Sequence, residues 1–324
     1  MIFKRRQLSI DGINLVLMLL SLLLAIMFPF KTFLYSFAIL GPLHYLTEIN
    51  WLDEKKYFTS QSNHFKKIAV AATIIFILPF VLKKEFFQII ANTTLLSMIG
   101  LSIGLSIWRK IFPSLLLMLV FGSIFLVFQN HSFLTSWVAV FIPTIVHVYV
   151  FTGIFMLYGA LKSKSKLGFA SVLILVLIPF VINFIDVDPL HYNFSNSIKT
   201  TFINNNFHVL NAKLSGLIGQ TEGTGFFFYE VLDLKIQIFI AFAYSYHYLN
   251  WFSKTTTIGW HKNFNVKKGL LIGSLWVIVV LLYYIDFSLG FMVVLFFSTL
   301  HVFVEFPLNV VTLREVFKEL FRLK

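Results

Sequence analysis

The chain has 324 residues, of which 58% are hydrophobic and 12% are charged, and its formal net charge at pH 7 is +12. Soluble domains of this size carry about twice that charged fraction, so the composition excludes an ordinary soluble protein. The chain contains no cysteine, which excludes disulfides, thiolate metal sites and cysteine nucleophiles.

Hydrophobic runs of about 18 residues or more recur along the chain, and each is long enough to cross the apolar core of a bilayer. They predict an all-α fold, a polytopic integral-membrane helical bundle of about ten transmembrane helices. We expect a single integral-membrane domain over residues 1–324. The expected spans are 12–30, 32–51, 67–82, 86–107, 111–129, 134–160, 167–185, 231–252, 268–285 and 288–308.

Basic residues gather in alternate loops between these spans. By the positive-inside rule, these loops and both termini are cytoplasmic, and residues 186–230 form an extracytoplasmic connection. We therefore expect a multi-pass protein of the inner, cytoplasmic membrane of a bacterium. Because topology accounts for the positive charge, no nucleic-acid partner is expected. The expected partners are the lipid bilayer and a hydrophobic small-molecule or lipid substrate, while the oligomeric state stays open.

Ionisable side chains within spans are costly and mark functional positions. The first are His44 and Glu48, in the inner half of the second span, within "GPLHYLTE". The next is His147, near the middle of the sixth span. Under the predicted topology both spans run from outside to inside, so these histidines lie between the mid-membrane and the cytoplasmic face.

The eighth and tenth spans repeat this placement. His247 and Asn250 lie toward the inner end of the eighth span, and His301 and Glu305 lie in the inner half of the tenth. His261 follows the eighth span in a cytoplasmic loop, from which it could close over the site as a fifth imidazole; a solvated loop histidine is the alternative.

The spacing of these residues favours a metal site. His44 with Glu48, and His301 with Glu305, are i,i+4 pairs, and each pair projects from one helix face. Imidazole and carboxylate ligands suit iron, zinc or manganese. Four histidines and two glutamates could hold one ion, with the carboxylates orienting the rings, or two ions with bridging carboxylates.

The segment "GPLHYLTE" carries a glycine, a histidine three residues later and an acidic residue four after that. It resembles the glycine–histidine–acid signature of the Brp/Blh family of integral-membrane β-carotene 15,15'-dioxygenases, although glutamate stands where that family has aspartate. The resemblance implies iron, Fe²⁺, that supports cleavage of a polyene by O₂. It further implies that His44, His147, His247 and His301 are the ligands and that Glu48 matches the acidic position.

Three functions follow from the same polar residues. The first is a metal-dependent oxygenase or dioxygenase acting on a lipid, isoprenoid or carotenoid, with Glu48, Glu305 and Asn250 as catalytic residues. The second is a proton- or cation-coupled transporter that uses the same histidines and glutamates as a relay. The third is a membrane O-acyltransferase, because His247 and Asn250 match the intramembrane His and Asn of that class. A non-catalytic assembly or cofactor-delivery partner is a further alternative.

Overall fold

The computed structural model describes residues 2–55, 70, 73, 84–108, 110–218, 225–255, 259 and 265–321. Every regular element among these residues is a helix, which confirms the all-α prediction. The candidate ligand His261 lies outside the described residues, and so does the expected span over 67–82 except for residues 70 and 73.

Five stretches of the described chain are long and apolar enough to cross a membrane. They are Ile10–Met27, Phe133–Ser163, Lys166–Phe184, Val266–Ile285 and Phe287–Phe321. Large apolar side chains are exposed along them, as at Val16, Leu173 and Leu271. An exposed apolar surface of this extent is stable against lipid and unfavourable in water. The chain is therefore a membrane protein, while ten crossings and two cytoplasmic termini stay predictions.

The first helix, α1 (Ile2–Met27), ends three residues before the predicted end of the first span. Pro29 begins the next helix, α2 (Pro29–Tyr35). Proline fits the first turn of a helix because its missing N–H has no intrahelical partner there. It also disfavours a helical backbone at Phe28, which separates the two helices.

The predicted second span consists of three successive helical pieces. After α2 come a π-helical turn, η1 (Ser36–Leu40), and then α3 (Gly41–Lys55). The predicted sixth span is likewise composite, with α7 (Ser132–Ser136), the π-helix η3 (Trp137–Phe151) and α8 (Thr152–Ser163).

The last helix, α14 (Phe287–Phe321), continues 13 residues beyond the predicted end of the tenth span at 308. Pro307 lies inside α14 and does not end it. Prolines are tolerated in membrane helices where neighbouring groups satisfy the freed carbonyls.

The described chain divides into two compact units. Unit 1 comprises Met1–His44 and Val148–Met292, and unit 2 comprises Tyr45–His147 and Val293–Lys324. The unit boundaries fall inside α3, η3 and α14. The single integral-membrane domain stays a prediction.

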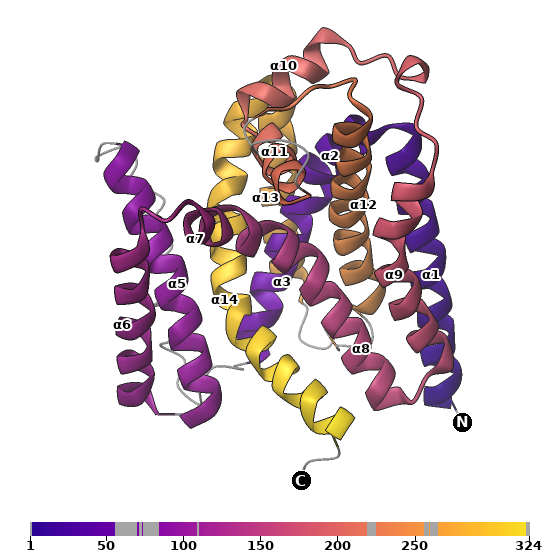
Figure 1. The fold of residues 1–324 in the computed structure, drawn as a ribbon. Coiled ribbons are helices and arrows are strands. Elements are labelled where there is room, and N and C mark those ends of the chain that lie inside the picture. The colour runs from indigo at the N-terminus through magenta and orange to yellow at the C-terminus, as the bar shows by residue number, and fades with distance from the viewer. Residues whose placement is uncertain are drawn as a thin grey trace. The chain divides into compact units, whose positions relative to one another are not determined.

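In unit 1, α1 packs along α9 (Lys166–Phe184) and α12 (Val231–Lys254) (Figure 1). Most residues of α12 are buried, including the polar residues Asp233, Gln237 and His247. The largely buried helix α12 therefore presents polar side chains to the interior of unit 1.

The segment between α9 and α12 is partly helical, with η4 (Pro189–His191), α10 (Asn196–Asn204) and α11 (His208–Leu217). Phenylalanines tie it to α2: the ring of Phe30 contacts those of Phe194 and Phe202 at centroid distances of 4.6 and 4.9 Å. Edge-on aromatic pairs at these distances stabilise packing beyond their buried area. The predicted extracytoplasmic connection is thus an ordered part of unit 1 where it is described.

In unit 2, α5 (Lys84–Trp108) and α6 (Ile111–Phe128) form a closely packed antiparallel hairpin (Figure 1). Gly100 and Gly104 face α6 so closely that a Cβ at Gly104 would lie 2.6 Å from the Cα of Ser114. Small residues four apart allow membrane helices to approach at the backbone. Glycine is therefore required at this contact.

Candidate metal centre

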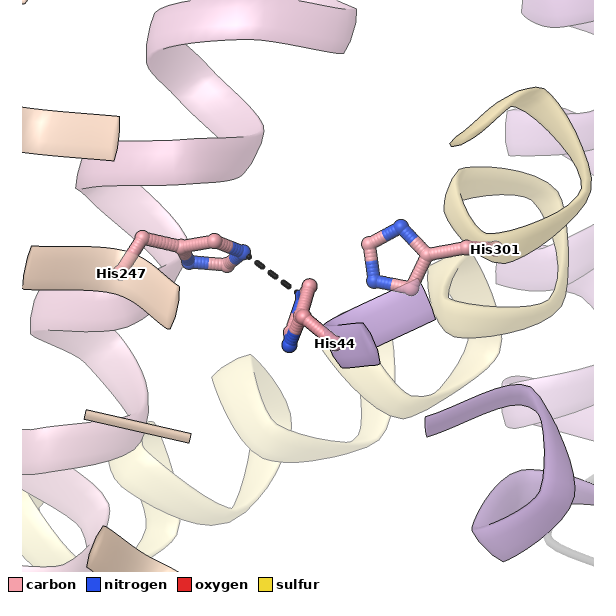
Figure 2. A group of neighbouring side chains, drawn as sticks. All are labelled: His44, His247 and His301. Carbon is pink, nitrogen blue, oxygen red and sulfur yellow. Dashed lines mark hydrogen bonds between the residues drawn. The ribbon is translucent and has the colours of Figure 1, made fainter. Parts of the chain in front are cut away.

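Unit 1 brings together two of the predicted histidines. His44 lies near the start of α3 and His247 in the second half of α12, and their Nε2 atoms are 3.1 Å apart. A dashed line marks this contact in Figure 2. Both imidazoles are buried, with Tyr248 and Trp251 packing against the ring of His44. His301, also drawn in Figure 2, belongs to unit 2.

A threonine determines the tautomer of His247. The Thr152 hydroxyl donates to the Val148 carbonyl at 2.7 Å and lies 2.8 Å from His247 Nδ1. A hydroxyl has one proton to donate, so Nδ1 of His247 must be the donor to Thr152 Oγ1. The lone pair of His247 is then on Nε2, directed at His44.

Two imidazole nitrogens that face each other at this distance repel unless a proton or a cation lies between them. Either His44 carries a proton on Nε2 and donates it to His247, or both nitrogens coordinate one ion. Two nitrogen ligands at ordinary metal distances, with a tetrahedral or octahedral angle between them, lie about 2.9–3.4 Å apart. The observed 3.1 Å fits either arrangement, and the Thr152 contact is the kind of outer partner that orients a metal-ligating imidazole.

Unit 2 brings together the other two histidines and both glutamates, which we call the carboxylate–histidine cluster: Glu48, His147, His301 and Glu305. All four side chains are buried. Glu48 comes from α3, His147 from η3, and the pair His301 and Glu305 from α14.

Distances within the cluster are those of atoms that share a proton or an ion. His301 Nε2 lies 3.1 Å from Glu48 Oε2 and 3.4 Å from Glu305 Oε2, and His147 Nδ1 lies 3.2 Å from the same Glu305 oxygen. His147, His301 and Glu305 each offer a ligand atom, and these atoms lie within 4.8 Å of one another. The three residues could therefore hold a metal ion.

The charge of the cluster also suits a cation. Two carboxylates buried in an apolar helical unit must be protonated, paired or neutralised by a cation. With neutral imidazoles, Glu48 and Glu305 together carry two negative charges, which a divalent cation balances. Nitrogen and carboxylate oxygen donors suit iron, zinc or manganese, and these four side chains are compatible with any of the three metals.

Asn250 lies one turn beyond His247 on α12 and is buried, but its Oδ1 has no hydrogen-bond partner among the described residues. No described contact joins Asn250 to His247 or to the carboxylate–histidine cluster, so its predicted catalytic role stays a prediction. The sequence reasoning overlooked Thr152. Threonines recur in these spans and commonly bond their own helix, so the sequence carries no signal that distinguishes this one.

Comparisons with known proteins find no relative. The chain matches no family model, no curated protein and no solved structure. The residues and their geometry are therefore the basis on which a function can be proposed.

Proposed function

We propose that this protein is a membrane-embedded, metal-dependent oxidative enzyme of the oxygenase type that acts on a lipid, isoprenoid or carotenoid substrate. The observation that carries the proposal is the carboxylate–histidine cluster, because two carboxylates and two imidazoles converge in a buried position. Ionisable groups in such a position are costly and mark function.

Iron is the ion that we propose, held by His147, His301 and Glu305, with the Glu48 carboxylate beside Nε2 of His301. A mixed imidazole and carboxylate set is the type that non-haem iron oxygenases use, and bound iron supplies the activation of O₂. The resemblance of "GPLHYLTE" to the Brp/Blh family supports a polyene substrate and, within unit 1, a metal-binding role for the pair His44 and His247.

The protein residues have separate roles in this proposal. The carboxylates of Glu48 and Glu305 provide the negative charge that retains the cation, and both lie against Nε2 of His301. Apolar side chains exposed along the membrane helices suit a hydrophobic substrate that enters from the bilayer of, we propose, a bacterial inner membrane.

The proposal is tested first by metal analysis of the full chain purified in mild detergent. We expect about one equivalent of tightly bound iron, because buried imidazole and carboxylate sites retain transition metals through purification. Glu305→Gln and His301→Ala should each retain less than about a tenth of it, since each removes a ligand. His191→Ala, whose side chain is 83% exposed in the connection, is the matched control and should retain the wild-type amount.

The second part of the test supplies β-carotene in detergent and measures O₂ uptake and cleavage products. The expected result is O₂-dependent cleavage by the wild type and the His191→Ala control and none by Glu305→Gln. Metal-free wild-type protein that moves protons or cations across proteoliposome membranes would contradict the enzyme and favour the transporter.

A further inference from the structure

A second group of buried polar side chains lies in unit 1, where α11 packs on the beginning of α12. Asn211, Asp233 and Gln237 are 0%, 2% and 0% exposed. None of them belongs to the histidine pair or to the carboxylate–histidine cluster. Buried polar groups in folded proteins are almost always hydrogen-bonded, so each of the three needs an explanation.

In these three side chains both amide nitrogens and one carboxylate oxygen take part in hydrogen bonds. Asn211 Nδ2 donates to the Asp233 carbonyl at 2.9 Å, and Gln237 Nε2 lies 3.5 Å from the Pro29 carbonyl. Asp233 Oδ2 accepts from the Phe227 N–H at 2.6 Å. Three oxygens are left without a hydrogen-bond partner among the described residues, namely Asn211 Oδ1, Asp233 Oδ1 and Gln237 Oε1.

The three side chains that carry these oxygens come from the contact between α11 and the beginning of α12. Asp233 and Gln237 are one turn apart on the same face of α12. The Asn211 amide is held at that turn by its bond to the Asp233 carbonyl, which places its oxygen beside the same stretch of backbone. The Asp233 side chain is held by the Phe227 N–H and the Gln237 side chain by the Pro29 carbonyl.

The chemistry of this oxygen set points to a hard cation. Carboxylate and amide oxygens are the donors that alkali and alkaline-earth ions prefer, and transition metals favour nitrogen or sulfur donors. Donors from water would satisfy the amide oxygens but would leave the Asp233 charge buried and unbalanced. The set has one carboxylate and two neutral amides, so a monovalent cation balances its charge.

We propose that Asn211, Asp233 and Gln237 form a sodium site that fastens α11 to the first turns of α12. This site is separate from the proposed metal centre, and it stands whether or not that centre holds iron. Its occupation joins the connection between α9 and α12 to the buried helix that carries His247.

The test measures thermal unfolding of the full chain in detergent while NaCl replaces choline chloride at constant ionic strength. KCl and CaCl₂ series run in parallel. A ligand that binds only the folded state raises its midpoint, so we expect a rise of at least about 3 °C in saturating NaCl. The rise should be absent in Asp233→Asn. Asp188→Asn, which alters an exposed capping carboxylate in the same connection, should retain the rise.

A second variant keeps the test decisive if Asp233→Asn fails to fold. Gln237→Glu adds a second carboxylate, so its midpoint should respond to CaCl₂ more than to NaCl. The proposal is wrong if wild-type unfolding is the same in NaCl and choline chloride, or if CaCl₂ alone stabilises it. It is also wrong if both variants keep the wild-type response to NaCl.

Discussion

At the scale of single residues, the hydroxyl of Thr152 determines how the histidine pair can act. By accepting the Nδ1 proton of His247, it leaves the Nε2 lone pair of that ring directed at His44. A histidine that takes part in binding needs one defined tautomer, and the partner of the other ring nitrogen sets it. Thr152 is therefore a positioning residue.

Thr152→Val tests this role, because valine keeps the shape and removes the hydroxyl. The buried Nδ1–H of His247 then loses its acceptor, which costs about 1–3 kcal/mol. We expect a lower midpoint of thermal unfolding and weaker metal retention. Thr94→Val is the control, because Thr94 bonds only the Ile90 carbonyl of its own helix. Equal effects of the two substitutions would show that Thr152 has no special role.

The sequence singled out histidines and glutamates that the structure brings together within each unit, but it did not predict how they pair. Spacing on one helix shows that His301 and Glu305 share a face, and the structure joins them at 3.4 Å. Spacing also suggested that Glu48 serves His44. In the structure Glu48 contacts His301, 253 residues away, and the described hydrogen bond of His44 is to His247. Rotation of each helix about its axis decides such contacts, and tertiary packing sets that rotation.

At the scale of elements, π-helical segments stand next to the candidate ligands. η1 ends just before α3, which carries His44, and η3 contains His147. π-helical turns are rare and occur frequently at functional sites, because an extra residue per turn changes the direction of the side chains that follow. The hydrophobic pattern predicted helix here and had no signal for the wider turn.

Pro143 lies inside η3, and its effect on His147 can be tested. Proline cannot donate to the carbonyl four residues earlier and clashes with it, which favours the wider turn. In Pro143→Ala, an ordinary α-helical turn becomes available and His147 turns away from Glu305. We expect the variant to fold and to retain several-fold less metal, measured per mole of protein.

Pro179→Ala is the control for the proline experiment. Pro179 is inside α9, which carries none of the candidate ligands, so its replacement should leave metal retention unchanged. Unchanged retention in Pro143→Ala as well would mean that the π-helical geometry does not depend on the proline.

At the scale of the whole molecule, the composition was enough to predict helices and a membrane location. The number of membrane crossings was predicted from the hydrophobic runs and their orientation from the charge of the loops. Both stay predictions. Because the chain has no cysteine, a single introduced cysteine is its only thiol. The orientation can therefore be measured one position at a time.

Lys162→Cys and Leu190→Cys are suited to this measurement. Leu190 is 92% exposed in the connection after α9, and Lys162 is exposed in the last turn of α8. By the positive-inside rule, Leu190→Cys should react with a membrane-impermeant maleimide in intact cells, and Lys162→Cys only after permeabilisation. The reverse pattern would overturn the predicted orientation.

The pairing of Glu48 with His301 also bears on how the protein is made. These residues are separated by 253 positions, and Glu305 follows His301 by one turn. The α5–α6 hairpin can form as soon as its two neighbouring helices are synthesised, whereas the carboxylate–histidine cluster waits for α14. Until then Glu48 and His147 have neither residue of α14 as a partner. Any ion that this cluster holds could therefore be loaded only after translation has passed residue 305.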